Sequence, residues 1–259
     1  WKRGFGPRFI QSVGVLDHDR IGVIIEGEQR AVVLDATTGR QAHRFPIVVR
    51  GKAYRSWTPH GLLTIDRNGT VYLQSGESGG GTWQHRAPDP ATIMAAAQLD
   101  RDRLAIGWTK QQVSVLDLAE RRALAEGDCR TIHPYNMGLS ADGQTLAVVG
   151  KNGSRFSSPM ALARMDLKNG KVSDPVEFGP LTKTAYNGAL FAHFDPLMPL
   201  LVQQEVQTRF KLRFVDVKAG RPLENQTVTV PPAIDRPRLR NGAVLITTRG
   251  GVHAVKPAE

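Results

Sequence analysis

The chain has 259 residues and a formal net charge of +10, from 34 lysines and arginines against 24 aspartates and glutamates. Hydrophobic residues make up 41% of the sequence, which is enough for a buried core. The apolar runs are far shorter than the roughly 20 residues of a membrane-spanning helix. The single cysteine, Cys129, excludes an internal disulfide bond.

A repeated unit organises the sequence. Apolar runs end in aspartate at Asp35, Asp117, Asp166 and Asp216, at intervals of 82, 49 and 50 residues. The first interval is about twice 41, so we expect one degenerate unit between residues 46 and 92. A period of 40–50 residues in a sequence without helical periodicity predicts the blades of an all-β propeller.

The predicted strands fall into six groups along the chain, each rich in β-branched or other apolar residues. The groups comprise residues 20–25, 31–35 and 42–45; 61–65 and 70–73; 93–99, 103–106 and 113–117; three strands within 139–172; 188–192, 200–203 and 212–216; and 243–248 with 252–255.

Turn residues separate these strands. Asp142-Gly143 predicts a tight hairpin, because glycine accepts the positive φ that such turns need. Three of the aspartates that mark the repeat are followed four residues later by a glycine, which suits a left-handed position after an aspartate turn. Arg121 occupies this glycine position in the third unit, so we expect a different turn there. We interpret the repeated aspartates as turn residues and not as catalytic ones.

The last group lacks an outer strand, and an unpaired edge is unfavourable in a closed ring. We therefore expect residues 2–8 to pair beside Val252–Val255 and to close a single propeller domain spanning residues 1–259, with six blades preferred and seven as the alternative. Residue 1 is Trp, so we expect a mature chain or part of a longer polypeptide. The sequence contains no targeting segment that would indicate whether the protein is cytoplasmic or periplasmic.

The unit Ser140-x-Asp142-Gly143-x-x-Leu146-Ala147-Val148, followed by an apolar-Asp-x-x-x-Gly-Lys/Arg segment, resembles the bacterial β-propeller repeats of the WD-repeat-like and quinoprotein-like groups. The resemblance covers nearly the whole chain and implies a propeller. The sequence departs from true WD repeats, because it has no Trp-Asp pair and no regular Gly-His dipeptide. It also lacks the recurrent tryptophan and the glycine-rich docking motif expected of quinone-binding propellers. Ligand and chemistry therefore stay open.

The sequence contains few motifs of known chemistry. The seven histidines show neither metalloprotease nor zinc-site spacing, and there is no Gly-x-Ser-x-Gly or phosphate-loop motif. We expect no cofactor and no catalytic or metal-binding residues, although an enzyme is not excluded.

The dipeptide Tyr-Asn occurs twice, 51 residues apart, where the fourth and fifth units enter their innermost strands. Loops on a rigid scaffold carry binding residues, and aromatic side chains make strong interface contacts. Three arginines alternate along a basic segment that could face an acidic partner. The predicted partner-binding residues are Trp57, Tyr135, Asn136, Tyr186, Asn187, Arg236, Arg238 and Arg240.

The sequence thus favours a non-catalytic scaffold in a bacterial assembly that binds a protein partner through one loop face. A partner with an acidic surface is one option. The alternative is a channel-centred enzyme or small-molecule binder, lactonase-like or quinone-dependent, for which the candidate residues are Asn136, Asn187, His193 and Asp235. A second alternative is nucleic-acid binding through a basic face. It is less favoured, because no aromatic ladder is interleaved with the basic residues.

Overall fold

A computed structural model describes most of the chain. The described ranges are 10–25, 30–49, 53–76, 81–88, 91–140, 142–153, 158–180, 191–194, 199–206, 209–216, 221–230, 238–240, 243–248 and 251–255. Side chains are described up to residue 177, apart from residue 136, and at 251, 252 and 254.

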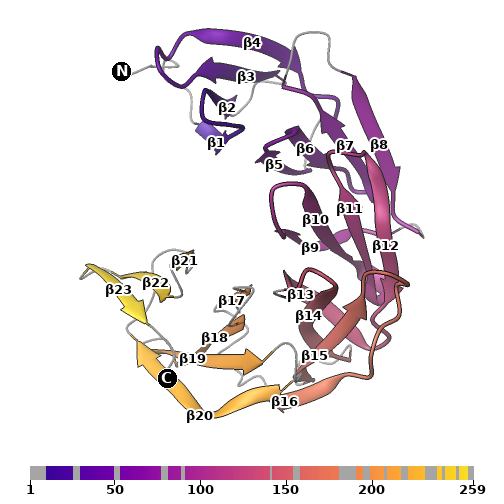
Figure 1. Cartoon of the computed structure of the whole chain (residues 1–259), viewed down its shortest axis with the longest axis vertical. Coiled ribbons are helices and arrows are strands. Elements are labelled where there is room, and N and C mark those ends of the chain that lie inside the picture. Colours follow the sequence, from indigo (N-terminus) through magenta and orange to yellow (C-terminus); the bar gives the residue numbers. More distant parts are fainter. Residues whose placement is uncertain are drawn as a thin grey trace. The chain divides into compact units, whose positions relative to one another are not determined.

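The described residues form six antiparallel sheets, each a meander of strands consecutive in sequence (Figure 1). The first two sheets are β1 (Ile10–Val15), β2 (Arg20–Ile25), β3 (Arg30–Asp35), β4 (Gln41–Pro46), and β5 (Tyr54–Thr58), β6 (Gly61–Ile65), β7 (Thr70–Gln74), β8 (Thr82–Arg86). The next two are β9 (Ile93–Gln98), β10 (Arg103–Trp108), β11 (Gln112–Asp117), β12 (Arg122–Asp128), and β13 (Ile132–Leu139), β14 (Thr145–Asn152), β15 (Pro159–Asp166), β16 (Val176–Pro180). The last two are β17 (Phe191–Phe194), β18 (Pro199–Val206), β19 (Arg209–Asp216), β20 (Arg221–Val230), and β21 (Arg238–Arg240), β22 (Ala243–Thr248), β23 (Gly251–Val255).

The all-β prediction is confirmed, and the unit expected between residues 46 and 92 is the sheet of β5–β8. The first five sheets have four strands each, whereas the described part of the last has three. Residues 2–8, which we expect to complete that sheet, lie outside the described ranges. Ring closure and the number of blades therefore stay predictions.

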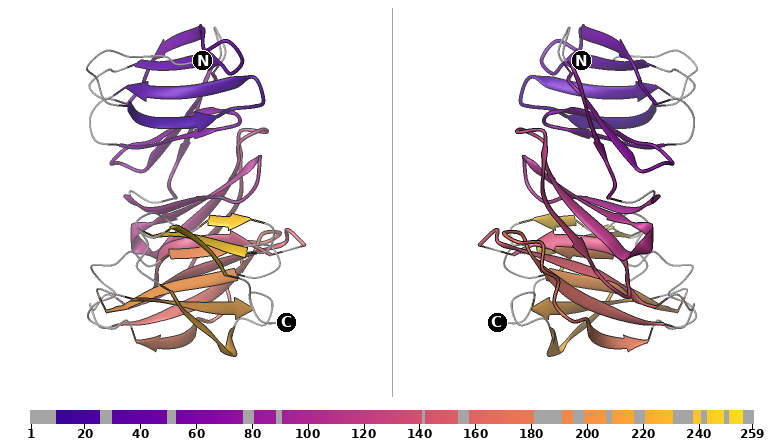
Figure 2. Two further views of the ribbon diagram at one scale, coloured as in Figure 1. Left: turned by 90° about the vertical axis from the view of Figure 1, so that its left-hand side faces the viewer. Right: turned by 90° about the vertical axis from the view of Figure 1, so that its right-hand side faces the viewer.

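The chain divides into two compact units. The first comprises residues 1–93, 100–104 and 116–123, and the second comprises residues 94–99, 105–115 and 124–259. The sheets β1–β4 and β5–β8 belong to the first unit, and the sheets from β13 onward belong to the second. Within each sheet the strands are hydrogen-bonded in chain order, and Figure 2 shows these sheets from two further sides.

Three of the repeated aspartates, Asp35, Asp117 and Asp166, form turns, as predicted, whereas the residues after Asp216 lie outside the described ranges. Asp35 accepts hydrogen bonds on Oδ1 from the backbone N of Thr38, at 2.6 Å, and from its hydroxyl, at 2.7 Å. Gly39, with a φ of 68°, then donates its backbone N–H to the Asp35 carbonyl oxygen at 2.9 Å. A carboxylate that accepts backbone donors two or three residues on stabilises the turn locally, and glycine takes the left-handed position without strain.

The prediction of a different turn at Arg121 is wrong. Arg121 has a φ of 55°, in the same left-handed region as Gly39 at 68° and Gly170 at 70°. Asp117 accepts the backbone N–H of Glu120 at 2.9 Å, so the aspartate keeps its turn role. The hydrogen bonds around the turn hold the backbone in this conformation although arginine, unlike glycine, is strained there.

The core of the second unit lies between the third and fourth sheets. It contains Val113 and Val115 of β11 with Leu146 and Val148 of β14, all fully or almost fully buried. Alternate residues of a strand face the same side, so each strand contributes every second residue to this cluster. In the described ranges, no helix is long and apolar enough to span a membrane.

Candidate functional site

The first strand of the fourth sheet, β13, contains a β-bulge at a predicted site residue. Pro134 pairs with Gly150 of β14, and Asn136 pairs with the adjacent Val149, so the register shifts by one residue at Tyr135. A bulge bends a strand and redirects the side chain at the inserted position, and bulges are frequent next to functional sites. The side chain of Tyr135 is half-buried at this point.

Two glycines allow neighbouring strands to approach this segment closely. A Cβ on Gly150 would lie 1.9 Å from the His133 carbonyl oxygen, and a Cβ on Gly107 of β10 would lie 2.5 Å from the Cβ of Pro134. Both distances are far below normal contact, so residues 133–134 fit only against glycine backbone. The segment that presents Tyr135 is therefore held from two sides.

Three polar residues are grouped at His133, two residues before Tyr135. The amide nitrogen of Gln111 lies 3.1 Å from Nε2 and 3.3 Å from Nδ1 of His133, close enough to donate a hydrogen bond to the imidazole. Lys151 is the cross-strand partner of His133 and is only 5% exposed. An imidazole and an amide are thus joined beside the segment that presents Tyr135, and both groups can hydrogen-bond a polar ligand group.

The backbone beside this segment is strained. Lys110 and Gln111 join β10 to β11 with successive positive φ angles of 66° and 63°, the signs of a type I′ hairpin turn that normally contains Asn-Gly. Arg130 has a φ of 58°, and the neighbouring Cys129 donates its backbone N–H to the Gln111 carbonyl oxygen at 2.7 Å. Residues held in this region cost about 1–3 kcal/mol each and cluster at functional sites.

This arrangement supports binding more directly than covalent chemistry. Cys129 lies beside the site, but burial, with a smaller contribution from Asp128, raises its pKa to about 12. The thiol is therefore protonated at neutral pH and unreactive. Within the part of the chain that the structure describes, no group of three His, Cys, Asp or Glu side chains could hold a metal ion.

A turn motif that the sequence reasoning missed occurs in the first and third sheets. Asp-x-Asp-Arg stands at residues 17–20 and again at 100–103. In each copy the arginine Nε donates to the first aspartate, at 2.7 Å from Arg20 and 2.6 Å from Arg103. The second aspartate of the later copy, Asp102, lies 2.7 Å from Nε2 of His60 in the β5–β6 turn. The later copy thus joins two turns through the contact between Asp102 and His60. The two copies stand 83 residues apart, and this repeat was visible in the sequence.

The structure corrects one predicted site residue. Trp57 is only 8% exposed, because its ring packs over Gly14 and Gly22 and makes an edge contact with Phe45, with ring centroids 6.2 Å apart. It is the fourth of the five residues of β5 and belongs to a hydrophobic core cluster. The exposed aromatic surface expected at this position is absent.

The other predicted residues are described only in part. Asn136 and, in β21, Arg238 and Arg240 have a described backbone, whereas Tyr186, Asn187 and Arg236 lie outside the described residues. Of the predicted set, Tyr135 alone has a described side chain at the candidate site. Its neighbours Gln111, His133 and Lys151 were missed, although a lysine directly after the run Val148-Val149-Gly150 was a visible signal.

Comparisons with known proteins support a fold but identify no family. No family model matches the sequence, and no curated protein matches it. The structure is similar to Kuenenia stuttgartiensis hydrazine synthase with a TM-score of 0.62 and 13% sequence identity, over 91% of this chain and 72% of that chain. In total 1345 chains of solved structures match, and a fold shared this widely does not identify an activity. The likeness supports a propeller-like all-β fold alone.

Proposed function

We propose that this chain is a β-propeller domain that binds a protein partner and has no catalytic role of its own. The bulge at Tyr135 in β13 forms the contact surface, together with Gln111 and His133. Six successive antiparallel sheets in the described residues support six blades. The three described strands of the last sheet are consistent with its completion by residues 2–8, which would close the ring.

The bulge at Tyr135 is the observation that carries the proposal. A regular strand would pair residue 135 with β14, whereas here the pairing passes from Pro134 directly to Asn136. The two strained turns beside it, at residues 110–111 and at 130, would be more stable with glycine or asparagine. Natural proteins retain such departures from local preference mainly where function requires them.

The proposal is tested by photo-crosslinking with p-benzoylphenylalanine at position 135 in the native host. Tyr54, which is 37% exposed on β5 in the other unit, is the matched control. We expect a discrete protein adduct from position 135 and none from position 54. Tyr135→Ala should lower recovery of that partner at least tenfold, since an aromatic interface anchor contributes about 2 kcal/mol or more. The proposal is contradicted if positions 135 and 54 give equal adducts. It is also contradicted if Tyr135→Ala recovers as much of the partner as the native chain does.

The channel-centred enzyme stays an alternative. Among its candidate residues, Asn136 and His193 have only a described backbone, and Asn187 and Asp235 lie outside the described ranges. A stoichiometric divalent ion in the purified full chain would favour this alternative over a scaffold. Nucleic-acid binding through a basic face predicts an affinity that falls steeply as the salt concentration rises. Binding that is absent or insensitive to salt would exclude it.

A further inference from the structure

Three segments of the described chain share the pattern of a basic residue, an asparagine and a glycine. They are Arg67-Asn68-Gly69, Lys151-Asn152-Gly153 and Lys168-Asn169-Gly170. In an Asn-Gly pair the glycine backbone nitrogen can reach the side-chain amide carbon, because glycine has no side chain to hinder the approach. The three local sequences are alike, so a difference in their chemistry has to come from the folded structure.

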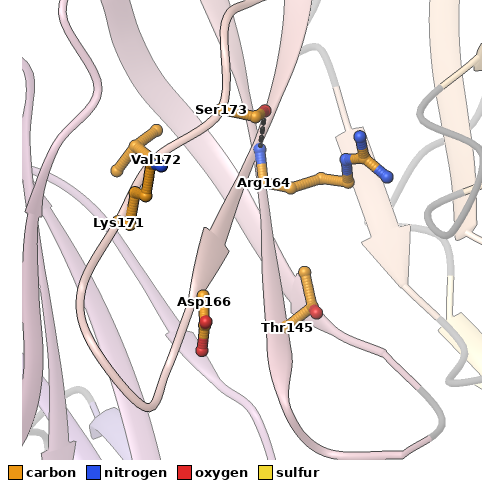
Figure 3. A pocket seen from close by; sticks show the side chains of 6 residues that line it. All are labelled: Thr145, Arg164, Asp166, Lys171, Val172 and Ser173. Atoms are coloured by element: carbon orange, nitrogen blue, oxygen red, sulfur yellow. Dashed lines mark hydrogen bonds between the residues drawn. The ribbon is translucent and has the colours of Figure 1, made fainter.

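The side-chain amide of Asn169 is fixed at both ends. Its Nδ2 donates to Oδ2 of Asp166 at 2.8 Å, and its Oδ1 accepts the Lys171 N–H at 2.8 Å. The Gly170 N–H donates to the Asp166 carbonyl oxygen, also at 2.8 Å. The turn joins Asp166 of β15 to Lys171, two of the residues that line the hollow in Figure 3. Both groups that would react with each other are therefore held in the turn.

The side-chain amide of Asn152 is held by two other segments of the chain. Its Nδ2 donates to Oε1 of Glu177 on β16 at 2.6 Å, and its Oδ1 accepts the hydroxyl of Thr131. The Gly153 N–H donates to the Thr131 carbonyl oxygen at 2.8 Å. This pair is thus held as firmly as Asn169 and Gly170.

Asn68, in the turn between β6 and β7, differs in both respects. Its side chain is exposed and makes no hydrogen bond within the part of the chain that the structure describes. The Gly69 nitrogen lies 3.3 Å from the Asp66 carbonyl oxygen, beyond the usual limit of about 3.2 Å for such a bond. The Asn68 side chain can therefore rotate toward the Gly69 nitrogen without breaking a hydrogen bond.

From this difference we propose that Asn68 is a deamidation site of the folded chain, whereas Asn152 and Asn169 are protected. Asparagine is a thermolabile residue. The Gly69 nitrogen attacks Cγ of Asn68, so that an N–Cγ bond forms and the Cγ–Nδ2 bond breaks. The proton of the Gly69 N–H leaves with Nδ2 as ammonia. Water then opens the cyclic imide at either of its carbonyl groups, which gives aspartate or isoaspartate.

Both products change the β6–β7 hairpin. Each adds a negative charge two residues from Asp66, whose Oδ1 accepts the N–H groups of Asn68 and Thr70 at 2.8 Å. Isoaspartate also inserts a methylene group into the backbone beside Gly69, where space is lacking: a Cβ on Gly69 would lie 2.4 Å from the Ala91 carbonyl oxygen. We expect the isoaspartyl chain to unfold at a lower urea concentration than the fresh chain.

The test follows deamidation of the whole folded chain at mildly alkaline pH by peptide mapping and mass spectrometry. Asn68 should react at least tenfold faster than Asn152 or Asn169, because each of these must first break two side-chain hydrogen bonds. In concentrated urea the three rates should converge, since the local sequences match. Glu177→Ala, a change at an exposed residue, should raise the rate at Asn152 several-fold and leave Asn68 and Asn169 unchanged.

The proposal is overturned if Asn68 of the folded chain reacts no faster than Asn152 and Asn169. It is also overturned if the same difference in rate persists in urea, because the local sequence would then be the cause. Both comparisons use the native chain and do not depend on the folding of a variant. Neither result bears on the contact surface at Tyr135.

Discussion

The contact of Trp57 with Gly14 and Gly22 allows a quantitative test of how the first two sheets pack. A Cβ on Gly22 would lie 2.3 Å from Cδ2 and 2.4 Å from Cε2 of the indole ring, whereas ordinary contact begins at 3.4 Å. The ring would have to retreat by about 1.1 Å, the difference between these distances, against Phe45 and a buried core. We expect Gly22→Ala to lower the free energy of unfolding by about 2–3 kcal/mol, at the upper end for overpacking.

Gly14 provides an internal comparison. Its Cβ would lie 2.3 Å from the Cβ of Trp57, an atom that moves only with the backbone. Trp57→Ala removes the ring, at a cost of about 3–5 kcal/mol, but keeps this Cβ. In the Trp57→Ala background, Gly22→Ala should therefore cost almost nothing, whereas Gly14→Ala should stay destabilising.

Urea unfolding followed by far-ultraviolet circular dichroism measures each variant. The double-mutant cycle for positions 22 and 57 should give a coupling free energy of about 2 kcal/mol, within the usual range for residues in contact. The cycle for positions 14 and 57 should give a much smaller one. If Gly22→Ala costs as much without the indole ring as with it, the packing argument is wrong.

Three further predictions concern turns. Lys110→Asn should raise the free energy of unfolding by about 1 kcal/mol, because asparagine tolerates the φ of 66° better than lysine. A lower melting temperature of this variant would contradict the prediction. Arg121→Gly should likewise stabilise the chain by about 1 kcal/mol in urea unfolding, since Gly39 and Gly170 hold the same left-handed position in their turns. An unchanged free energy of unfolding would mean that the turn imposes no strain on Arg121. The hydrogen bond from the Arg20 side chain, with smaller contributions from backbone N–H groups and the arginine charge, holds the pKa of Asp17 below its usual value. The stability from Asp17 is therefore present above about pH 4 and lost as the pH falls through the lowered pKa, so Asp17→Asn should be destabilised at pH 7 but match the native chain near pH 2. An equal deficit at both pH values would contradict this last prediction.

Local interactions account for what the sequence predicted correctly. Asp35 caps a turn through Thr38 and Gly39, all within four residues, so the motif could be recognised without knowledge of distant contacts. Antiparallel meanders also pair strands that are adjacent in sequence, which is why the repeat of β-branched runs identified the sheets. The period predicted an additional sheet between residues 46 and 92, although its turn residues differ from those of the other units.

The tertiary structure decided which side chains are exposed and which are held together. An aromatic residue near a turn, Trp57, was expected on the surface, but glycines 43 and 35 positions earlier, Gly14 and Gly22, create the space that buries it. Gln111 meets His133 because a strained hairpin of the third sheet lies against the first strand of the fourth. Strand periodicity tells which residues share a face. Burial and side-chain contact depend on what a distant part of the chain places against that face, and no local pattern of residues encodes that.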